Sequence, residues 1–212
     1  MLDKSEVKGL IFHPEKIVRQ YAMEYFVEGG IGDSEITNML LELYSKGVDD
    51  EETMDILRCM SALPHNAETL RRLWKITPPD PNMLFHIDKA IGEADLELLK
   101  ILPDIRPREQ MYIDILEKRF LFASKGTEKL WESLWEHSRS AIGKYLDEFD
   151  YNYGELIIKE LARRKDFPMD KYLQKIQIDY PEEYEGWDDT YLSVLAGELK
   201  SKESIPFLVR TL

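Results

Sequence analysis

The sequence contains one cysteine and no long apolar run, and each scarcity excludes a class of protein. Cys59 is the single cysteine among 212 residues, so no disulfide can form within the chain. This composition fits the reducing cytosol, and we expect a cytoplasmic protein. The longest stretch without a charged residue covers residues 59–67, far less than the roughly 20 apolar residues that span a bilayer. Met1 is followed by charged residues rather than an apolar segment, so no secretory signal is expected.

Basic residues are scarce relative to acidic ones. Lys and Arg total 28 against 41 Asp and Glu, which gives a net charge of −13. Nucleic acids and anionic lipid surfaces are bound mainly through basic surfaces. The charge balance therefore disfavours both as partners, and we expect no nucleic acid and no membrane.

Residues that could carry catalysis or bind a metal are few and scattered. The four histidines fit no metal-ligand spacing, and His13 and His65 each adjoin a proline at an expected helix boundary, where a turn or capping role is favoured. Cys59 lies in a helical apolar stripe without a neighbouring base, which favours a packed structural thiol. No G-x-S-x-G motif is present. We expect no catalytic residue, no metal and no cofactor.

Apolar residues are plentiful and recur at helical spacing. They make up 43% of the chain, and aromatic residues make up 11%. Residues 17–26 place their apolar side chains on one helical stripe, and residues 36–44 do the same after a glycine-rich turn. Sustained alternation, the pattern of a strand, is absent. The sequence therefore predicts an all-α fold.

The predicted helices fall into successive pairs joined by short turns. The first helices of these pairs begin near residues 14, 51, 81, 107, 151 and 188. At the fourth of these, Pro107 is suited to the first helical position. One hairpin has too little apolar surface to fold alone, so neighbouring hairpins would cover one another in a stack.

Two segments carry a likeness to a known family. The run His13-Pro14-Glu15-Lys16-Ile17-Val18-Arg19-Gln20-Tyr21-Ala22 resembles the first helix of a HEAT repeat, with its Pro start, Val-Arg and Ala. Residues 195–199 and 204–209 look like the turn of HEAT-like repeats, including the group named after phycobilisome lyase subunits. Together these segments contain 21 of the 212 residues. The resemblance implies architectural roles for these positions, among which Gly197 would relieve crowding near a helix end.

The fold that we expect is a right-handed α-solenoid, a superhelix of about five to six antiparallel helix hairpins that is HEAT-like or ARM-like. We expect residues 1–212 to form a single helical-repeat domain. The sequence ends at Leu212 inside an apolar stripe. We therefore expect that further repeats follow it, or that this edge pairs with a second copy as a homodimer.

Three local patterns have a structural and a functional interpretation. The loop of residues 29–34 could bind an anion, but it lacks the Gly-Lys-Ser/Thr of a phosphate loop, so we favour a helix C-cap followed by an N-cap. Arg71, Arg72 and Lys75 form a short basic cluster, which is most often a solvated helix face. Trp131 and Trp135, one helical turn apart, are expected in the core.

The segment Asp179–Asp189 is the strongest local candidate for a binding surface. It combines six acidic residues and three aromatic residues with no basic residue. It could hold a basic or proline-containing peptide, or it could be a solvated loop between repeats whose last acids cap the next helix. The candidate partner-binding residues are Tyr180, Tyr184, Trp187, Asp188 and Asp189.

The function that the sequence favours is a non-catalytic helical-repeat scaffold that mediates protein–protein interaction with a protein or peptide partner. This follows from the HEAT-like resemblance and from the lack of a catalytic motif. The alternative is an enzyme or enzyme subunit of the lyase-type HEAT-like group, acting on a protein-bound or small-molecule substrate.

Overall fold

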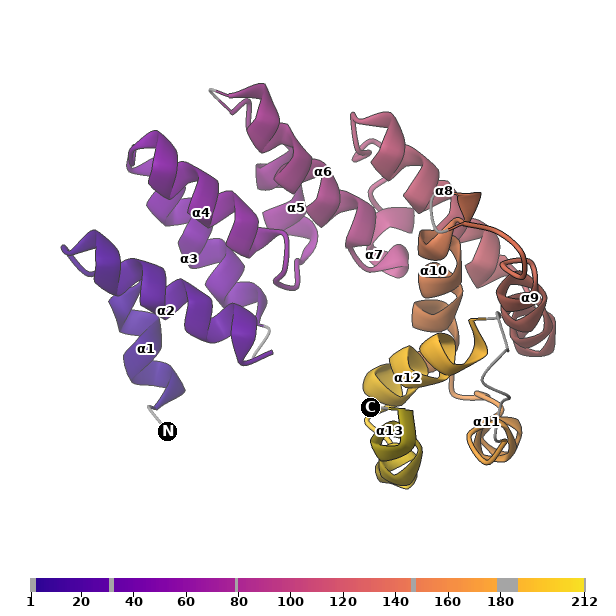
Figure 1. The fold of residues 1–212 in the computed structure, drawn as a ribbon. Helices are drawn as coiled ribbons and strands as arrows, with labels where there is room; N and C mark the ends of the chain where they lie inside the picture. Colours follow the sequence, from indigo (N-terminus) through magenta and orange to yellow (C-terminus); the bar gives the residue numbers. More distant parts are fainter. Residues whose placement is uncertain (1–2, 31–32, 79, 146–147, 179–186, 212) are drawn as a thin grey trace. The chain divides into compact units, whose positions relative to one another are not determined.

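The all-α prediction is confirmed. The computed structural model describes residues 3–30, 33–78, 80–145, 148–178 and 187–211, and within these ranges it contains helices and no strand (Figure 1). No helix among these residues is both long enough and apolar enough to cross a bilayer.

The chain divides into two compact units, Met1–Leu116 and Glu117–Leu212, and the boundary lies within one helix, α8. The first unit contains α1 (Lys4–Leu10), α2 (Lys16–Glu28), α3 (Ser34–Ser45), α4 (Asp50–Met60), α5 (Ala67–Trp74), the 3₁₀ turn η1 (Pro81–Met83), α6 (Leu84–Glu93), α7 (Leu96–Lys100) and the start of α8 (Gln110–Ser124). The second unit contains α9 (Thr127–Arg139), α10 (Tyr151–Ala162), α11 (Met169–Lys175), α12 (Asp188–Leu199), η3 (Lys202–Ser204) and α13 (Ile205–Thr211).

The helices of the first unit form two rows. Helices α2, α4 and α6 pack side by side in one row, and α3 packs against α5 in the other (Figure 1). Across the rows, α1 contacts α2, α3 contacts α4 and α5 contacts α6. The closest pairs of consecutive helices therefore begin one helix earlier than the sequence pattern indicated. Helix α1 was not predicted, because it is short and buries only Val7.

Several polar contacts connect a helix to a residue about one helix pair further along the chain. In the first unit, the Arg19 Nε lies 2.5 Å from Glu52 Oε1, and the Trp74 Nε1 donates to the Arg106 carbonyl at 3.2 Å. In the second unit, the Tyr172 hydroxyl lies 2.6 Å from the Ser204 hydroxyl. The two residues of these pairs are 32 or 33 positions apart. Further contacts of this kind, 32 to 35 positions apart, are Gln20–Asp55, Asn38–Arg72, Trp74–Arg108, Lys118–Asp150 and Ile176–Arg210.

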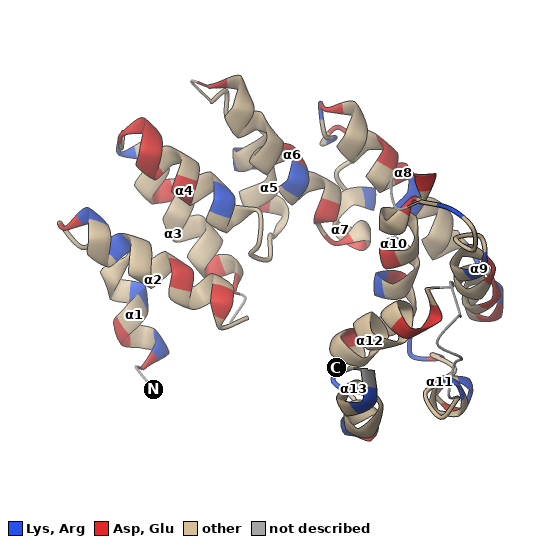
Figure 2. Ribbon diagram, viewed as in Figure 1, with Lys and Arg blue, Asp and Glu red and all other residues tan. Residues whose placement is uncertain are grey.

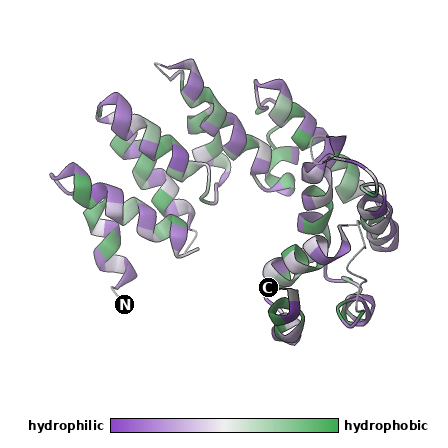
Figure 3. Ribbon diagram, in the orientation of Figure 1, coloured by the Kyte–Doolittle hydropathy of each residue, from purple (hydrophilic) through white to green (hydrophobic). Residues whose placement is uncertain are grey.

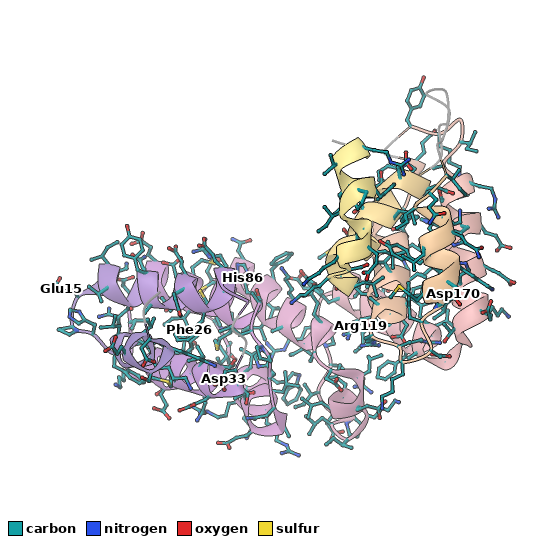
Figure 4. The ribbon with its side chains drawn as sticks, turned by 90° about the horizontal axis from the view of Figure 1, so that it is seen from below. Glu15, Phe26, Asp33, His86, Arg119 and Asp170 are labelled. Carbon is teal, nitrogen blue, oxygen red and sulfur yellow. The ribbon has the colours of Figure 1, made fainter. Side chains whose placement is uncertain are left out.

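Hydrophobic and hydrophilic residues share most helices, so each helix buries one face and exposes another (Figure 3). In the first unit, Phe26 is fully buried and points between the helix rows, whereas the exposed Glu15 lies at an edge (Figure 4). In the second unit, Trp131, Trp135 and Tyr191 are buried in one apolar cluster. The core placement expected for Trp131 and Trp135 is confirmed.

The start of α4 is capped by a local residue, and the start of α8 is capped by a remote one. Asp49 caps α4, and the acidic residues of its first turn stand out in Figure 2.

The prediction that Pro107 opens a helix is wrong, because α8 begins at Gln110. The buried Asp88 of α6 instead accepts hydrogen bonds of 2.6 Å from the backbone amides of both Arg108 and Glu109. A cap from another helix leaves no local sequence signal.

Two of the helical glycines, Gly154 and Gly197, differ in their surroundings. A methyl group at Gly154 would lie 2.1 Å from the hydroxyl of the buried Tyr191, so α10 and α12 can approach only because this residue is glycine. At Gly197 no atom of the other described residues, apart from the neighbouring backbone of its own helix, lies within 4 Å of such a group. The expectation that Gly197 relieves crowding is therefore wrong.

These surroundings predict opposite effects of the same substitution. Gly154→Ala should destabilise the protein by about 1–3 kcal/mol, because Tyr191 cannot move without disturbing the core. Gly197→Ala, the matched control, should stabilise it by about 0.5–1 kcal/mol, because alanine loses less conformational entropy in a helix. Urea unfolding measures both, and equal effects of the two substitutions would contradict this packing.

Candidate functional site

A partly open cleft of about 230 Å³ lies between the end of α5 and the segment that follows α7, within the first unit. Its lining combines apolar side chains, two basic side chains and one acidic side chain. The lining residues are Arg71, Trp74, Lys75, Ile101, Leu102, Pro103, Asp104 and Ile105. We call this the α5 cleft.

The α5 cleft carries a positive charge in an acidic protein. Arg71 and Lys75 stand four residues apart near the end of α5, so they lie on the same helical face. Both are exposed, and neither forms an ion pair with another of the described residues. Asp104 is the one carboxylate in the lining, so the cleft has one more basic than acidic side chain, whereas the whole chain has a net charge of −13.

Hydrogen bonds hold the two walls of the cleft together. The Trp74 indole N–H donates to the Arg106 carbonyl at 3.2 Å. The Arg108 guanidinium donates to the Trp74 carbonyl and, at 3.3 Å, to the Ile76 carbonyl, and it lies 5.9 Å from the centre of the Trp74 ring. Because these bonds use free carbonyls at the end of α5, the guanidinium also meets the negative end of the helix dipole. The cleft is therefore preformed.

The rim of the cleft exposes a large apolar side chain. Ile101 is 69% exposed, whereas Leu102 and Ile105 beside it are buried. Leu102 and Ile105 thus attach the segment to the core, and Ile101 is left in contact with solvent. An exposed branched side chain beside an aromatic ring offers apolar contact to a ligand.

The acidic segment predicted as a binding surface is only partly described. Tyr180 and Tyr184 lie outside the described residues. Trp187 packs on Phe149, with ring centres 5.1 Å apart, directly before α12. The binding role of the five residues stays a prediction.

The two remaining acids of this segment are in the first turn of α12. Asp188 is 3% exposed; it accepts a hydrogen bond from the Ser138 hydroxyl and pairs with the Lys175 ammonium at 2.9 Å. Burial and the neighbouring carboxylate of Asp188 raise the pKa of Asp189. Asp188 therefore contributes to the packing of α12 against α9 and α11.

The other residues singled out in the sequence have structural partners. The His13 Nδ1 accepts from the Glu15 amide at 3.1 Å, and the His65 Nε2 lies 2.9 Å from the Met60 carbonyl, which confirms their turn roles. Asp33 caps α3 by accepting from the Glu35 amide, as the N-cap interpretation predicted. Burial raises the pKa of Cys59 to about 11, so its thiol stays protonated at neutral pH.

Metal ligands are not gathered in the part of the chain that the structure describes: no group of three or more His, Cys, Asp and Glu there could hold an ion. Comparisons with protein-family models, with curated proteins and with solved structures find no match to this chain.

The α5 cleft was not predicted from the sequence. The sequence pattern favours a solvated helix face for Arg71 and Lys75. The available signal was two basic residues one turn apart around a tryptophan, directly before the proline-rich run of residues 78–81. The other wall comes from residues about 30 positions later, which no local pattern connects to α5.

His137 lies in the aromatic cluster of the second unit. Its ring stacks on Phe149 with centres 4.5 Å apart, and its Nδ1 lies 2.8 Å from the Tyr191 hydroxyl. Burial lowers the pKa of His137, although the Asp150 carboxylate acts against that shift. The folded protein therefore resists protonation of this ring.

This predicts a loss of stability in mild acid. Since the pKa of His137 is lower in the folded state than in the unfolded chain, the unfolded chain takes up the proton first as the pH falls below about 6.5. The free energy of unfolding should decrease over that range, and it should decrease less in His137→Phe, which keeps the ring but cannot titrate. Urea unfolding above and below about pH 6.5 measures this free energy for both the wild type and the variant. Equal decreases in both proteins would contradict the assignment.

Proposed function

We propose that this chain is a non-catalytic helical-repeat scaffold that binds another protein. The observation that carries the proposal is a set of polar contacts between helix pairs, many of them 32 to 35 residues apart and others, in the second unit, 39 to 54 apart. Polar pairs 32 to 35 residues apart connect neighbouring helices in both units. A stack of helix pairs, in which each pair is stabilised by the next, requires contacts of this kind.

The proposal includes the finer fold, a HEAT-like right-handed solenoid. The contacts of Arg19, part of the Val-Arg that carries the resemblance, support it. The guanidinium donates hydrogen bonds to both carboxylate oxygens of the buried Glu52 in α4. It also donates to the His13 carbonyl at 2.7 Å and to the Pro14 carbonyl at 2.9 Å. One side chain thus fixes both the start of its own helix and its contact with the next pair.

The chemistry of the α5 cleft supports binding rather than catalysis. Its polar lining consists of Arg71, Lys75, Asp104 and the indole of Trp74. The lining offers charge and apolar contact, which are the elements of recognition.

The C-terminal edge is proposed as a homodimer contact. Ile205 and Val209, one helical turn apart on α13, are 55% and 67% exposed. Two apolar side chains on one helical face would be buried by a second copy.

Affinity capture tests the scaffold proposal. The tagged chain, incubated with lysate of its own source and crosslinked, should retain a specific protein in stoichiometric amount. A second, differently tagged copy in the same lysate should be retained as well if α13 forms a homodimer. Retention of a small molecule with no protein would contradict the scaffold proposal and favour an enzyme.

The acidic segment is tested in the same experiment. Replacing Tyr184 and Trp187 with Ala should reduce capture if the segment is a binding surface, and unchanged capture would remove that role. Because Trp187 packs on Phe149, the free energy of unfolding of this variant has to be measured alongside the capture.

A further inference from the structure

We infer that the α5 cleft binds a short acidic peptide segment of a partner protein, in which a carboxylate stands beside a large apolar side chain. The inference rests on the proposed scaffold function, and it names the place and the chemistry of recognition.

The charge of the cleft selects the carboxylate. Arg71 and Lys75 lie one helical turn apart at the end of α5, both are exposed, and neither forms an ion pair with another of the described residues. The chain has a net charge of −13, so the excess of basic over acidic side chains in this lining favours the cleft as the place where an acidic ligand binds. A guanidinium presents two parallel N–H donors, which match the two oxygens of a carboxylate.

The apolar lining selects the neighbouring side chain. Ile101, which is 69% exposed, and Trp74 lie in the same lining as the two cations. A residue such as Leu or Phe next to the carboxylate would cover both and remove apolar surface from water. The two cations and the apolar lining together select a carboxylate next to a large apolar residue, a peptide motif that neither would select alone.

The size of the cleft favours a peptide over a small molecule. Its volume of about 230 Å³ is below the roughly 300 Å³ at which pockets that enclose a drug-sized ligand begin. A partly open cleft of this size accommodates one or two side chains of a longer segment. The hydrogen bonds of Trp74 and Arg108 hold the walls in place, so binding does not have to order them.

Asp104 makes the proposal testable in both directions. Its carboxylate lies in the same lining as the two cations, so it opposes an acidic ligand. Removing this charge should tighten the binding of an acidic peptide, whereas removing the two positive charges should weaken it. A nonspecific apolar surface would respond to neither change.

The experiment selects peptides from a phage-displayed random library on the wild-type chain and then measures labelled copies by fluorescence anisotropy. The selected peptides should carry Asp or Glu beside a large apolar residue. Their affinity should fall at least about tenfold in the double variant Arg71→Gln/Lys75→Gln, because both charge-assisted contacts are lost. It should fall in Ile101→Ser and rise in Asp104→Asn.

The control is the double variant Lys129→Gln/Lys159→Gln, which removes the same charge from exposed positions of the second unit. It should change the affinity less than about twofold, because neither lysine lines the cleft. Ile101 and Asp104 are both exposed, so a preserved unfolding curve is expected for both single variants.

Selection of basic peptides or of no peptide, or equal affinities in the Arg71→Gln/Lys75→Gln variant and the control, would overturn the inference. Binding of a single-stranded RNA or a small aromatic acid in place of any peptide would overturn it as well. Such results leave the scaffold proposal intact if lysate capture still retains a stoichiometric protein. Failure of the peptide inference can therefore be distinguished from failure of the scaffold proposal.

Discussion

The burial of each helix by its neighbours is the constraint on which the rest of this structure depends. The helices α1, α5 and α11 have only seven or eight residues, which is too short for stable helices on their own in water. They persist because tertiary contacts cover their apolar faces and because side chains bond across to the next pair. The Arg19–Glu52 pair shows the principle: Glu52 is almost fully buried, and its charge is tolerated there only because a guanidinium meets both carboxylate oxygens.

The same constraint explains where a binding site can form. The neighbours that stabilise a helix place few demands on the sequence at its end or in the turn that follows. The α5 cleft lies at the end of such a helix. There the bonds of Trp74 and Arg108 fix a turn against the end of α5, while Arg71, Lys75 and Ile101 remain exposed. The helices position the cleft. Its lining has a positive net charge, whereas the net charge of the whole chain is negative.

The sequence predicted the fold class well and the α5 cleft not at all. Apolar periodicity located most helices, and the cap of α3 by Asp33 and the turn roles of His13 and His65 followed from local rules. What local rules could not supply were contacts between distant segments. The remote cap by Asp88, the space that Gly154 leaves for Tyr191 and the pairing of Trp74 with the Arg106 carbonyl each join residues at least 20 positions apart. Helix α1 was missed for a related reason, since a single buried valine makes no periodic pattern.

The central claim, that successive helix pairs stabilise one another through contacts between neighbours, is tested most directly by hydrogen exchange in Glu52→Gln. This substitution keeps the size of the side chain but removes the charge that Arg19 meets. If neighbouring helix pairs stabilise one another, the amides in α2 and α4 should exchange faster and those in α10 and α12 should be unchanged. The reason is that the lost stability affects only adjacent pairs. An equal increase in exchange along the whole chain would contradict it.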